Sequence, residues 1–579
     1  MRVSTLCERF LATASRLGDA VALCGDGQPS LSWREFAARA EDFAFGFREL
    51  GVSEGDTVAL ITRNTSLFHV LDMALMLASA TPFSIAANEP AERIAQLLEV
   101  AECKLVLVEN RHLELVRKSL GDRTAVIVVA FDGDRAVRPD LSLAEIEATG
   151  REPGCRDEPL APVTDAGAVA TLIFTSGTTG TPKAVQLSHR AISVSLDSFD
   201  RLAPYGDGDD HFISYLPLSH IAERFMTYYS AVAFGGSIHC VTDAAMLYDE
   251  IARVRPTRFF GVPRVYEKLA DRARAQIRSS VERSDALDRA LAGVRAQQSG
   301  EVVTLRSSGA TTDAFVDVRT LLGFDRTRYL GVATAPSSRD LLEFFLAIGL
   351  PVGDIWGMSE AIMCTANPVG RIRLGSVGVF LDGVEATVAD DGELLVRGPN
   401  VFSGYKGDPA RTAELVDHDG WVHTGDLGAI DEDGYLSILG RKKELMITAT
   451  GKNLMPAVIE GAVKSASRLI DHVHSVADGR RYVTALISLD REELERLAGT
   501  HGLSGAFDEL AASPPVQAEI RDAVGRANKQ LSHPESVRAW RIVGEEWLPG
   551  GDEVTPTMKL RRAEISRKYA DVIDQLYEE

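Results

Sequence analysis

The sequence has few cysteines, and their arrangement argues against the usual cysteine-based sites. Only six occur in 579 residues, and none forms a CxxC pair or a Cys/His spacing that would ligate a metal. Scattered cysteines in a long chain are typical of a reducing cytosol, where they act as small buried hydrophobic residues. The N-terminal stretch carries Glu8 and arginines and lacks the apolar core of a signal peptide. We therefore expect a cytoplasmic protein.

Long apolar runs are also missing. The longest one, residues 69–87, is interrupted by Asp72 and Pro82, whereas a membrane-spanning helix needs about 20 apolar residues. The stretch therefore predicts a buried helix followed by a strand, and we expect no transmembrane segment. Peripheral binding at a membrane surface is left open.

Positive charge is scarce relative to negative charge. The chain has 62 Lys and Arg against 83 Asp and Glu, which gives a formal net charge of −21. Proteins that coat DNA or RNA need a basic surface, so we expect no nucleic-acid partner. A local basic pocket for a nucleotide is not excluded. The remaining composition, 45% hydrophobic and 25% charged, is that of a globular protein, and the length predicts two or more domains.

Short apolar runs alternate with helical patterns through much of the chain. This alternation predicts βαβ units, and hence two α/β layers built on largely parallel sheets. Between residues 365 and 440 the sequence pattern changes to short strand-like runs separated by Gly/Asp turns, which predicts a β-rich, barrel-like module. The last 140 or so residues fit the size of a small α+β domain. We therefore predict an N-terminal domain over residues 1–440 and a C-terminal domain over residues 441–579.

The segment TSGTTGTPK, residues 175–183, has the composition of a phosphate-binding loop. It follows the apolar stretch ATLIF (170–174) and precedes a helical pattern over residues 189–199. Glycines let successive backbone N–H groups face one anion, hydroxyls add donors, and Lys183 adds a positive charge. A flexible Ser/Thr/Gly linker is the alternative, but a linker rarely lies between a buried strand and a helix. The segment does not match the Walker A pattern.

Further motifs follow this loop in order along the chain. They are WGMSE (356–360), GELLVRGPNVFSGY (392–405), GWVHTGDLG (420–428), GRKKE (440–444) and PTMKLRR (556–562). Together with TSGTTGTPK they resemble the motifs of the adenylate-forming enzymes, the superfamily of acyl-CoA synthetases, luciferases and peptide-synthetase adenylation domains. SYLPLSHIAERF (214–225), FGVPRVYEKL (260–269) and GRKKELMITATGKN (440–453) are most similar to the long-chain fatty acyl-CoA synthetases.

The resemblance implies a reaction in two halves. A carboxylate attacks the α-phosphorus of ATP, which releases pyrophosphate and leaves an acyl-adenylate; a thiol then attacks the acyl carbon and AMP leaves. Adenylation supplies the leaving group that a carboxylate lacks. The implied ligands are a carboxylic acid, most simply a fatty acid, with ATP, Mg²⁺ and CoA. An acyl or peptidyl carrier protein is the alternative thiol acceptor.

The resemblance also assigns residues to the nucleotide. Glu360 is expected to ligate Mg²⁺, although an isolated Glu would be read as an ordinary surface carboxylate. Asp426 is expected to accept hydrogen bonds from the ribose hydroxyls, although TGDLG alone would suit a turn. Arg441 should reach the ribose or a phosphate. The other residues expected around ATP or AMP are Thr175, Ser176, Gly177, Thr178, Thr179, Gly180, Lys183, Ala335, Pro336, Trp356, Gly357 and Ser359.

The remaining assignments concern the acid, the thiol and motion. Lys559 is expected to bridge the incoming carboxylate and the α-phosphate, and Lys443 to be the hinge about which the C-terminal domain rotates as a lid. His220, Ala333 and the neighbouring Thr334 are expected near the acyl pocket, although a lone His is more often a core residue. Thr450, Gly451 and Lys452 are expected to flank the CoA tunnel.

The sequence departs from the family pattern at three positions. Ala184 stands where PKG is usual, and Trp356 replaces the usual Tyr beside the adenine. Thr450 replaces a Gly, and a β-branched residue there would narrow the thiol tunnel or exclude a positive φ. This departure leaves an acceptor other than CoA open.

Three functions remain open at this point. The first is a fatty acyl-CoA synthetase, and the second is an enzyme that adenylates a specialised acid for a carrier-protein thiol or an amine. The third is a non-catalytic nucleotide-binding protein of the same fold. Retention of Lys183, Glu360, Asp426 and Lys559 favours an enzyme, and the GRKKE hinge followed by GKN favours CoA as acceptor.

Overall fold

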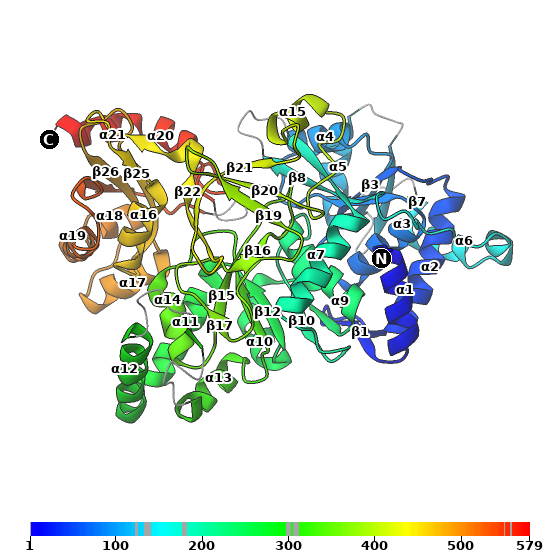
Figure 1. The fold of residues 1–579 in the computed structure, drawn as a ribbon, viewed down its shortest axis with the longest axis horizontal. Coiled ribbons are helices and arrows are strands. Elements are labelled where there is room, and N and C mark those ends of the chain that lie inside the picture. The colour runs from blue at the N-terminus through cyan, green and yellow to red at the C-terminus, as the bar shows by residue number, and fades with distance from the viewer. Residues whose placement is uncertain are drawn as a thin grey trace. The chain divides into compact units, whose positions relative to one another are not determined.

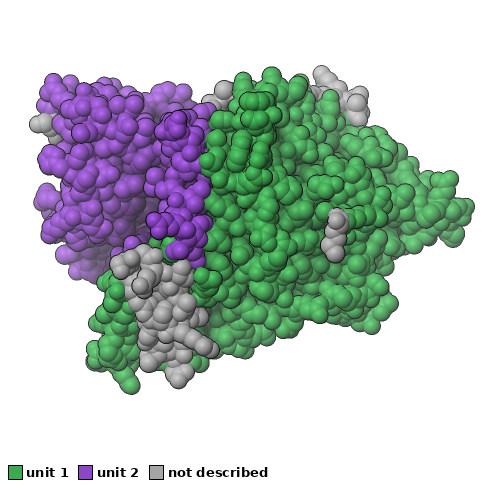
Figure 2. All heavy atoms as spheres, viewed as in Figure 1, with its two compact units in different colours: residues 1–332, 343–387, 395–424 green, residues 333–342, 388–394, 425–579 purple. Residues whose placement is uncertain are grey.

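The computed structural model describes residues 2–121, 126–131, 141–176, 182–296, 303–304, 312–548, 551–555 and 559–578 (Figure 1). The chain divides into two compact units (Figure 2). Unit 1 comprises Met1–Val332, Glu343–Thr387 and Leu395–Thr424, and unit 2 comprises Ala333–Leu342, Val388–Leu394 and Gly425–Glu579. The domain boundary at residues 440/441 stays a prediction.

The largest sheet of unit 1 has seven strands and is mainly parallel. Its middle strands are fully buried apolar runs, as is typical of a parallel sheet covered on both faces. The strand order is β7 (Leu141–Ser142), β6 (Ile127–Phe131), β5 (Leu105–Glu109), β3 (Thr57–Ile61), β4 (Thr81–Ser84), β8 (Val169–Ser176), β9 (Pro182–Ser188). The prediction of an α/β fold is confirmed.

Three smaller sheets also lie in unit 1. A four-stranded sheet joins the N-terminal strands to later ones in the order β10 (His211–Ser214), β11 (Ser237–Cys240), β1 (Val21–Cys24), β2 (Leu31–Ser32). A five-stranded sheet follows the order β12 (Arg258–Gly261), β14 (Tyr329–Val332), β15 (Val352–Trp356), β16 (Thr365–Ala366), β18 (Val379–Phe380). β13 (Val303–Thr304) pairs with β17 (Arg371–Ile372).

Helices connect these strands. Several begin with a capping box, in which a Ser or Thr and the Glu three residues later satisfy each other's backbone N–H, as at Thr5 and Glu8. The helices up to residue 254 are α1 (Leu6–Leu17), α2 (Trp33–Glu49), α3 (Ser66–Leu77), α4 (Ala91–Val100), α5 (Leu113–Leu120), α6 (Leu143–Gly150), α7 (His189–Leu202), α8 (Ile221–Glu223), α9 (Ser230–Phe234) and α10 (Leu247–Val254). They are followed by α11 (Pro263–Arg278), α12 (Val281–Ala296), α13 (Val316–Leu322), α14 (Arg339–Ala347) and α15 (Pro409–Leu415).

The apolar stretch of residues 69–87 forms α3 and β4, as predicted, and its charged residue is paired. Asp72 is fully buried, with its Oδ1 2.8 Å from Arg224 Nη1, and Arg224 is equally buried. Arg224 also donates to Leu218 O, Tyr229 Oη and Ser84 Oγ, at 2.8 to 2.9 Å. A buried guanidinium is tolerated only when it is paired and hydrogen-bonded. The ion pair therefore ties α3 and β4 to the segment around α8. Within the described ranges, no helix has the length and apolar content to cross a bilayer.

The helix expected over residues 189–199 is present as α7, but the strand β9 before it was not predicted. The helix α7 does not follow TSGTTGTPK directly, because β9 lies between them and pairs antiparallel with β8. Thr175 is opposite Lys183 and Ser176 is opposite Pro182, so the segment 177–181 connects two strands of a hairpin. Pro182 is the first residue of β9, a position where its missing N–H is tolerated.

Unit 2 contains the C-terminal part of the chain. A four-stranded sheet, through which the division into units runs, has the order β19 (Glu385–Val388), β20 (Glu393–Arg397), β21 (Val422–Ile430), β22 (Leu436–Arg441). This sheet corresponds to the β-rich module predicted before residue 440. The 3₁₀ turn η6 (Lys442–Glu444) leads to the hairpin of β23 (Met446–Ile447) and β24 (Asn453–Leu454).

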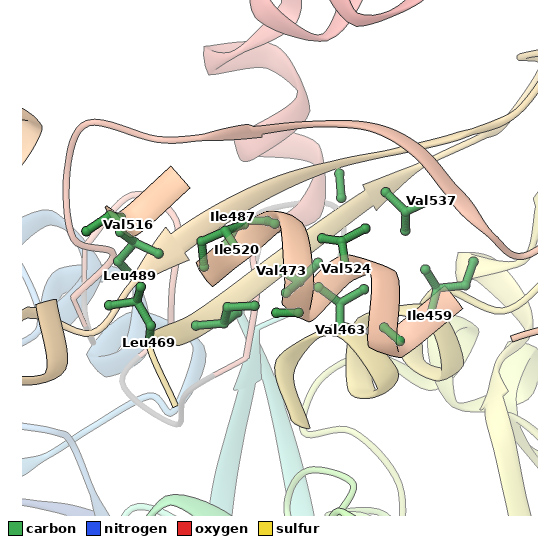
Figure 3. Packing of buried hydrophobic residues seen from close by; sticks show 14 of the residues in the cluster. Ile459, Val463, Leu469, Val473, Ile487, Leu489, Val516, Ile520, Val524 and Val537 are labelled. Atoms are coloured by element: carbon green, nitrogen blue, oxygen red, sulfur yellow. The ribbon is translucent and has the colours of Figure 1, made fainter. Parts of the chain in front are cut away.

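The C-terminal core is a three-stranded sheet between helices. β25 (Ile470–Val476) is antiparallel to β26 (Val483–Leu489), which is parallel to β27 (Val537–Ile542). Successive side chains of β26 point to opposite faces of the sheet, so Ile487 lies in one hydrophobic core and Leu486 in another. Ile487 packs with residues of α16 (Pro456–Ser465) and α19 (Pro514–Asn528) (Figure 3), and Leu486 packs with residues of α20 (Arg562–Lys568) and α21 (Ala570–Glu578). Two further helices, α17 (Arg491–Thr500) and α18 (Phe507–Ala511), contribute to the first core.

Candidate functional site

The phosphate loop is anchored at both ends by the hairpin of β8 and β9. Thr175 and Ser176 end β8, and Lys183 lies opposite Thr175 on β9. Four residues predicted to bind phosphate, Gly177, Thr178, Thr179 and Gly180, lie outside the described residues. The hairpin therefore fixes the backbone on which Thr175 and Lys183 are carried.

Ala184, the first departure from the family pattern, is part of the core. Its side chain is buried among residues of β3, β4 and β8, and it is not among the residues with positive φ. Its carbonyl oxygen accepts a hydrogen bond from Lys406 N at 2.9 Å. An alanine in place of glycine is thus compatible with this backbone.

Tyr405 joins two of the predicted site residues and was not predicted itself. Its hydroxyl donates to Glu360 Oε1 at 2.7 Å, and its ring centroid is 4.9 Å from Lys183 Nζ. The structure thus brings Lys183 and Glu360 to one aromatic side chain, although they are far apart in the sequence. Tyr405 is the last residue of GELLVRGPNVFSGY, so the aromatic residue that ends this motif was the available signal.

The turn after β15 that carries Glu360 is folded tightly on itself. A Cβ at Gly357 would lie 2.1 Å from Ile362 O and 2.9 Å from Met363 Cα, so only glycine fits. Trp356 is buried at the end of β15, Ser359 is half-buried, and Glu360 is 8% exposed. Phe402 N donates to Glu360 O at 2.7 Å, which ties the turn to the segment that carries Tyr405.

Backbone strain coincides with the predicted site segments. Six non-glycine residues of the described chain have positive φ, and two of them are β-branched: Thr334 at 78° and Ile362 at 51°. A β-branched residue in this region is a true outlier, and such strain concentrates at functional sites. Thr334 lies in the segment Ala333–Pro336, whose residues range from half-buried to exposed, and Ile362 follows Glu360 by two residues. Both outliers therefore mark segments that the motifs had already indicated.

Asp426 and Arg441 form a pair in unit 2. They are opposite each other on β21 and β22, and Arg441 Nε lies 2.9 Å from Asp426 Oδ1. Asp426 is 4% exposed, whereas nearly half of the Arg441 side chain is exposed. A buried carboxylate beside a fixed cation suits the recognition of ribose hydroxyls near a phosphate.

Ion pairs flank the predicted hinge residue on both sides. Lys442 Nζ lies 2.6 Å from Asp391 Oδ2 and 2.8 Å from Glu393 Oε2, and these acids raise the pKa of Lys442. Glu444 Oε2 lies 3.2 Å from Arg562 Nε, and Arg562 binds Glu460 through both of its terminal nitrogens. Lys443, between Lys442 and Glu444, is exposed.

The predicted CoA-tunnel residues lie together in the turn between β23 and β24. Thr450, Gly451 and Lys452 are all exposed, and Gly451 has a φ of 74°. Thr450 is not among the residues with positive φ, and its Oγ1 lies 3.0 Å from Thr448 Oγ1. The backbone concern raised by Thr450 is therefore removed, because the turn places its positive φ at the following glycine.

Lys559 is exposed, and its backbone is hydrogen-bonded to Thr555. Thr555 N donates to Lys559 O at 2.8 Å, Lys559 N donates to Thr555 Oγ1 at 3.0 Å, and Val554 bridges Leu560. These contacts fix the backbone at Thr555 and Lys559. This arrangement suits a cation that must reach a substrate.

His220 is the residue before α8 and is half-buried. Its backbone N donates to Pro217 O at 2.9 Å, and Arg224 N donates to its carbonyl at 3.4 Å. Arg224 is the arginine of the buried ion pair with Asp72. The position of His220 is thus set by a buried network, and its assignment to the acyl pocket remains a prediction.

Replacement of Asp426 by asparagine is expected to raise the KM for ATP about tenfold, because a charge-assisted hydrogen bond contributes about 1.5 kcal/mol or more. The substitution keeps the size of the side chain but removes the charge. ATP-dependent pyrophosphate exchange measures the effect. Asp390→Asn, at an exposed position in unit 2, is the matched control. An unchanged KM in Asp426→Asn would exclude a ribose-binding role.

The chain matches known protein families over most of its length. The model of the AMP-binding enzyme family matches residues 10–406, and the model of the AMP-binding enzyme C-terminal domain matches residues 443–579. A Mycobacterium tuberculosis protein, named as a proposed fatty-acid–CoA ligase, fadD11, is 41% identical over 424 residues, which are 71% of this chain and 73% of its own length. The long-chain-fatty-acid–CoA ligase FadD15 of Mycobacterium bovis is 33% identical over 575 residues, 94% of this chain and 91% of its own.

A solved structure shares the fold. The adenylation domain of a carboxylate reductase from Mycobacterium chelonae superposes with a TM-score of 0.77 at 21% identity, covering 99% of this chain and 91% of its own. At that identity the likeness concerns the fold alone.

Proposed function

The chain belongs to the AMP-binding enzyme family, and from this premise we propose that it is an AMP-forming acyl-CoA synthetase that activates a fatty acid with ATP. The observation that carries the proposal is that both named relatives are fatty-acid–CoA ligases and that each aligns with more than two thirds of this chain. Of the motif residues that suggested the reaction from sequence, Thr175, Lys183, Glu360, Asp426 and Lys559 lie among the described residues.

The proposed reaction balances in two steps. A carboxylate oxygen of the acid attacks the α-phosphorus of ATP, the bond from that phosphorus to the bridging oxygen breaks, and pyrophosphate leaves. The sulfur of CoA then attacks the acyl carbon of the adenylate, the thiol proton is lost, and AMP leaves with the electrons of the broken bond. In both steps negative charge builds on phosphate oxygens, which fixed cations and donors stabilise.

For the nucleotide we propose the residues that the motifs indicated. Thr175, Lys183 and the rest of the loop would bind the β- and γ-phosphates, with Ser359 at the α-phosphate. Asp426 and Arg441 would bind the ribose, and the strained backbone at Thr334 supports a role for the neighbouring segment in binding the adenine. Lys559 would neutralise the charge that develops between the carboxylate and the α-phosphate.

Glu360 is proposed as the protein ligand of Mg²⁺. Mg²⁺ takes one or two carboxylates together with phosphate oxygens and waters. Glu360 fits this chemistry because it is a nearly buried carboxylate whose Oε1 is held by Tyr405, so that Oε2 can face a cation. No cluster of three His, Cys, Asp or Glu side chains that could hold a metal occurs among the described residues, and none is needed here. Mg²⁺ bound at Glu360 would lower the charge on the phosphates.

Lys443 is proposed as the hinge between the two half-reactions. The ion pairs of Lys442 hold the chain to Asp391 and Glu393 before this residue, and the pair of Glu444 with Arg562 holds it to α16 and α20 after it. A change of backbone angles at Lys443 would leave both sets of ion pairs intact, which supports its role as the hinge. Hinges commonly absorb rotation at one or a few such residues.

CoA is proposed as the acceptor. The turn of Thr450, Gly451 and Lys452 is exposed, and its backbone accommodates the threonine without positive φ. A carrier-protein thiol would approach the adenylate by the same chemistry. Analysis of the products distinguishes the two acceptors.

The test of the proposed function is a product analysis with a long-chain fatty acid, ATP, Mg²⁺ and CoA. The expected products are acyl-CoA, AMP and pyrophosphate in equal amounts. Accumulation of the acyl-adenylate without acyl-CoA would instead indicate another acceptor, such as a carrier protein. Absence of any ATP consumption would contradict the proposal and favour a nucleotide-binding protein without catalysis.

A further inference from the structure

We propose that Tyr405 is a positioning residue of the Mg²⁺–ATP site, whose hydroxyl orients Glu360 and whose ring holds Lys183. The inference rests on the proposed function, because it gives Glu360 and Lys183 their parts in ATP binding. The inference adds Tyr405 to these two residues. Tyr405 would contact neither ATP nor the metal, but it would orient the Glu360 carboxylate and the Lys183 ammonium group, which do.

The hydroxyl of Tyr405 selects which oxygen of Glu360 can meet a cation. It donates to Oε1 at 2.7 Å, and both side chains are nearly inaccessible, with 4% of Tyr405 and 8% of Glu360 exposed. A carboxylate that accepts a hydrogen bond on one oxygen cannot rotate freely about its last bond. The remaining oxygen, Oε2, is therefore presented in a fixed direction, which favours binding of a cation through one oxygen.

The ring of Tyr405 restrains the ammonium group of Lys183. Lys183 Nζ lies 4.9 Å from the ring centroid, within the range of a cation–π interaction. A lysine on a strand loses much side-chain freedom when it binds a phosphate. Since the ring already restrains Lys183 in the folded protein, part of this loss of side-chain entropy occurs on folding and not on binding of ATP.

The backbone holds Tyr405 in place through contacts with β9. Val185 and Tyr405 form an antiparallel bridge, Lys406 N donates to Ala184 O at 2.9 Å, and Gln186 N donates to Gly404 O at 3.0 Å. The segment thus runs along the strand that carries Lys183. In addition, Tyr405 N donates to Thr412 Oγ1 at 2.9 Å. The tyrosine is fixed from several sides, as a positioning group must be.

The test measures ATP binding by calorimetry across a Mg²⁺ titration, without acid, so that no turnover occurs. Tyr405→Phe keeps the ring and removes the hydroxyl, and it is expected to weaken ATP binding about 5- to 10-fold at limiting Mg²⁺. Saturating Mg²⁺ should restore most of the affinity, because Lys183 is still held. Tyr405→Leu also removes the ring and should lose a further factor of about 2 to 5 that Mg²⁺ does not restore.

Tyr205→Phe is the matched control, because it removes another tyrosine hydroxyl bond of 2.7 Å, to Ser230 Oγ, elsewhere in unit 1. It should leave the Mg²⁺ dependence unchanged. The double variant Lys183→Met/Tyr405→Leu should lose less binding free energy for ATP than the sum of the losses of the two single variants. Each single variant already removes the contact between Lys183 and the ring. The proposal is overturned if Tyr405→Phe binds ATP as the wild type does at every Mg²⁺ concentration. Failure of the wild type to bind ATP would instead overturn the proposed function together with this inference.

Discussion

Replacement of Lys559 by alanine is expected to lower acid-dependent pyrophosphate exchange by about 100- to 1,000-fold. Removal of one preorganised group that stabilises developing charge typically costs that much in turnover. Lys559 is exposed, and two backbone hydrogen bonds join it to Thr555, so the substitution removes a side chain that is not part of a hydrophobic core. The measurement is the rate of fatty-acid-dependent exchange between pyrophosphate and ATP.

The second half-reaction separates this role from a general loss of activity. Chemically prepared acyl-adenylate bypasses the step assigned to Lys559, so Lys559→Ala should still form the thioester from it at close to the wild-type rate. Lys529→Ala, an exposed lysine at the end of α19, is the control for loss of a surface charge. Exchange by Lys559→Ala within a few-fold of the wild type would refute a catalytic role for this lysine.

Replacement of Lys443 by proline is expected to impair thioester formation about 100-fold while adenylation changes little. The proline ring fixes φ at residue 443 and disfavours a helical conformation at Lys442. Because Lys442 and Glu444 are both held by ion pairs, the rotation cannot easily move to a neighbouring residue. A displacement of about 1 Å from a reactive geometry can already cost a factor of about 100.

Lys443→Ala is the control, since it removes the charge and leaves the backbone free to turn. It should behave like the wild type in both assays. Equal losses of pyrophosphate exchange and of thioester formation in Lys443→Pro would contradict the hinge and indicate a local disturbance. The comparison needs only the ratio of the two rates, so a variant of lower overall stability remains informative.

The fold class could be predicted from local pattern because short buried strands and amphipathic helices alternate along the chain. The helix and strand of residues 69–87 formed as expected, with Asp72 inside α3 and Pro82 inside β4. The strand β9 was missed because it begins with a proline and contains Lys183 and Gln186 among its apolar residues. Its identity as a strand depends on pairing with β8, which local sequence does not reveal.

A site residue could be predicted where it stands in one short motif. It could not be predicted where its role depends on contact between two segments that are distant in the sequence. Asp426, Arg441 and Glu360 each stand in a motif, although their binding roles stay predictions. Tyr405 could not be assigned because its meaning comes from Glu360, 45 residues earlier in the chain, and from the pairing of its segment with β9. The ion pair of Glu444 with Arg562 is similar, since it joins the hinge motif to the segment after Lys559. Such contacts follow from the tertiary fold.

The depth of the acyl pocket also depends on the tertiary fold. Pockets for apolar ligands are lined by side chains from many segments, so no spacing in the sequence fixes their depth. His220 illustrates this, because its position depends on Arg224 and through it on Asp72 of another helix.

The most direct test of the proposed function is fatty-acid-dependent exchange of labelled pyrophosphate into ATP, measured without CoA across a panel of carboxylic acids. The expected result is Mg²⁺-dependent exchange that is fastest with a long-chain fatty acid and negligible when no acid is added. Exchange with short aromatic acids but with no long-chain fatty acid, or no exchange with any acid, would contradict it.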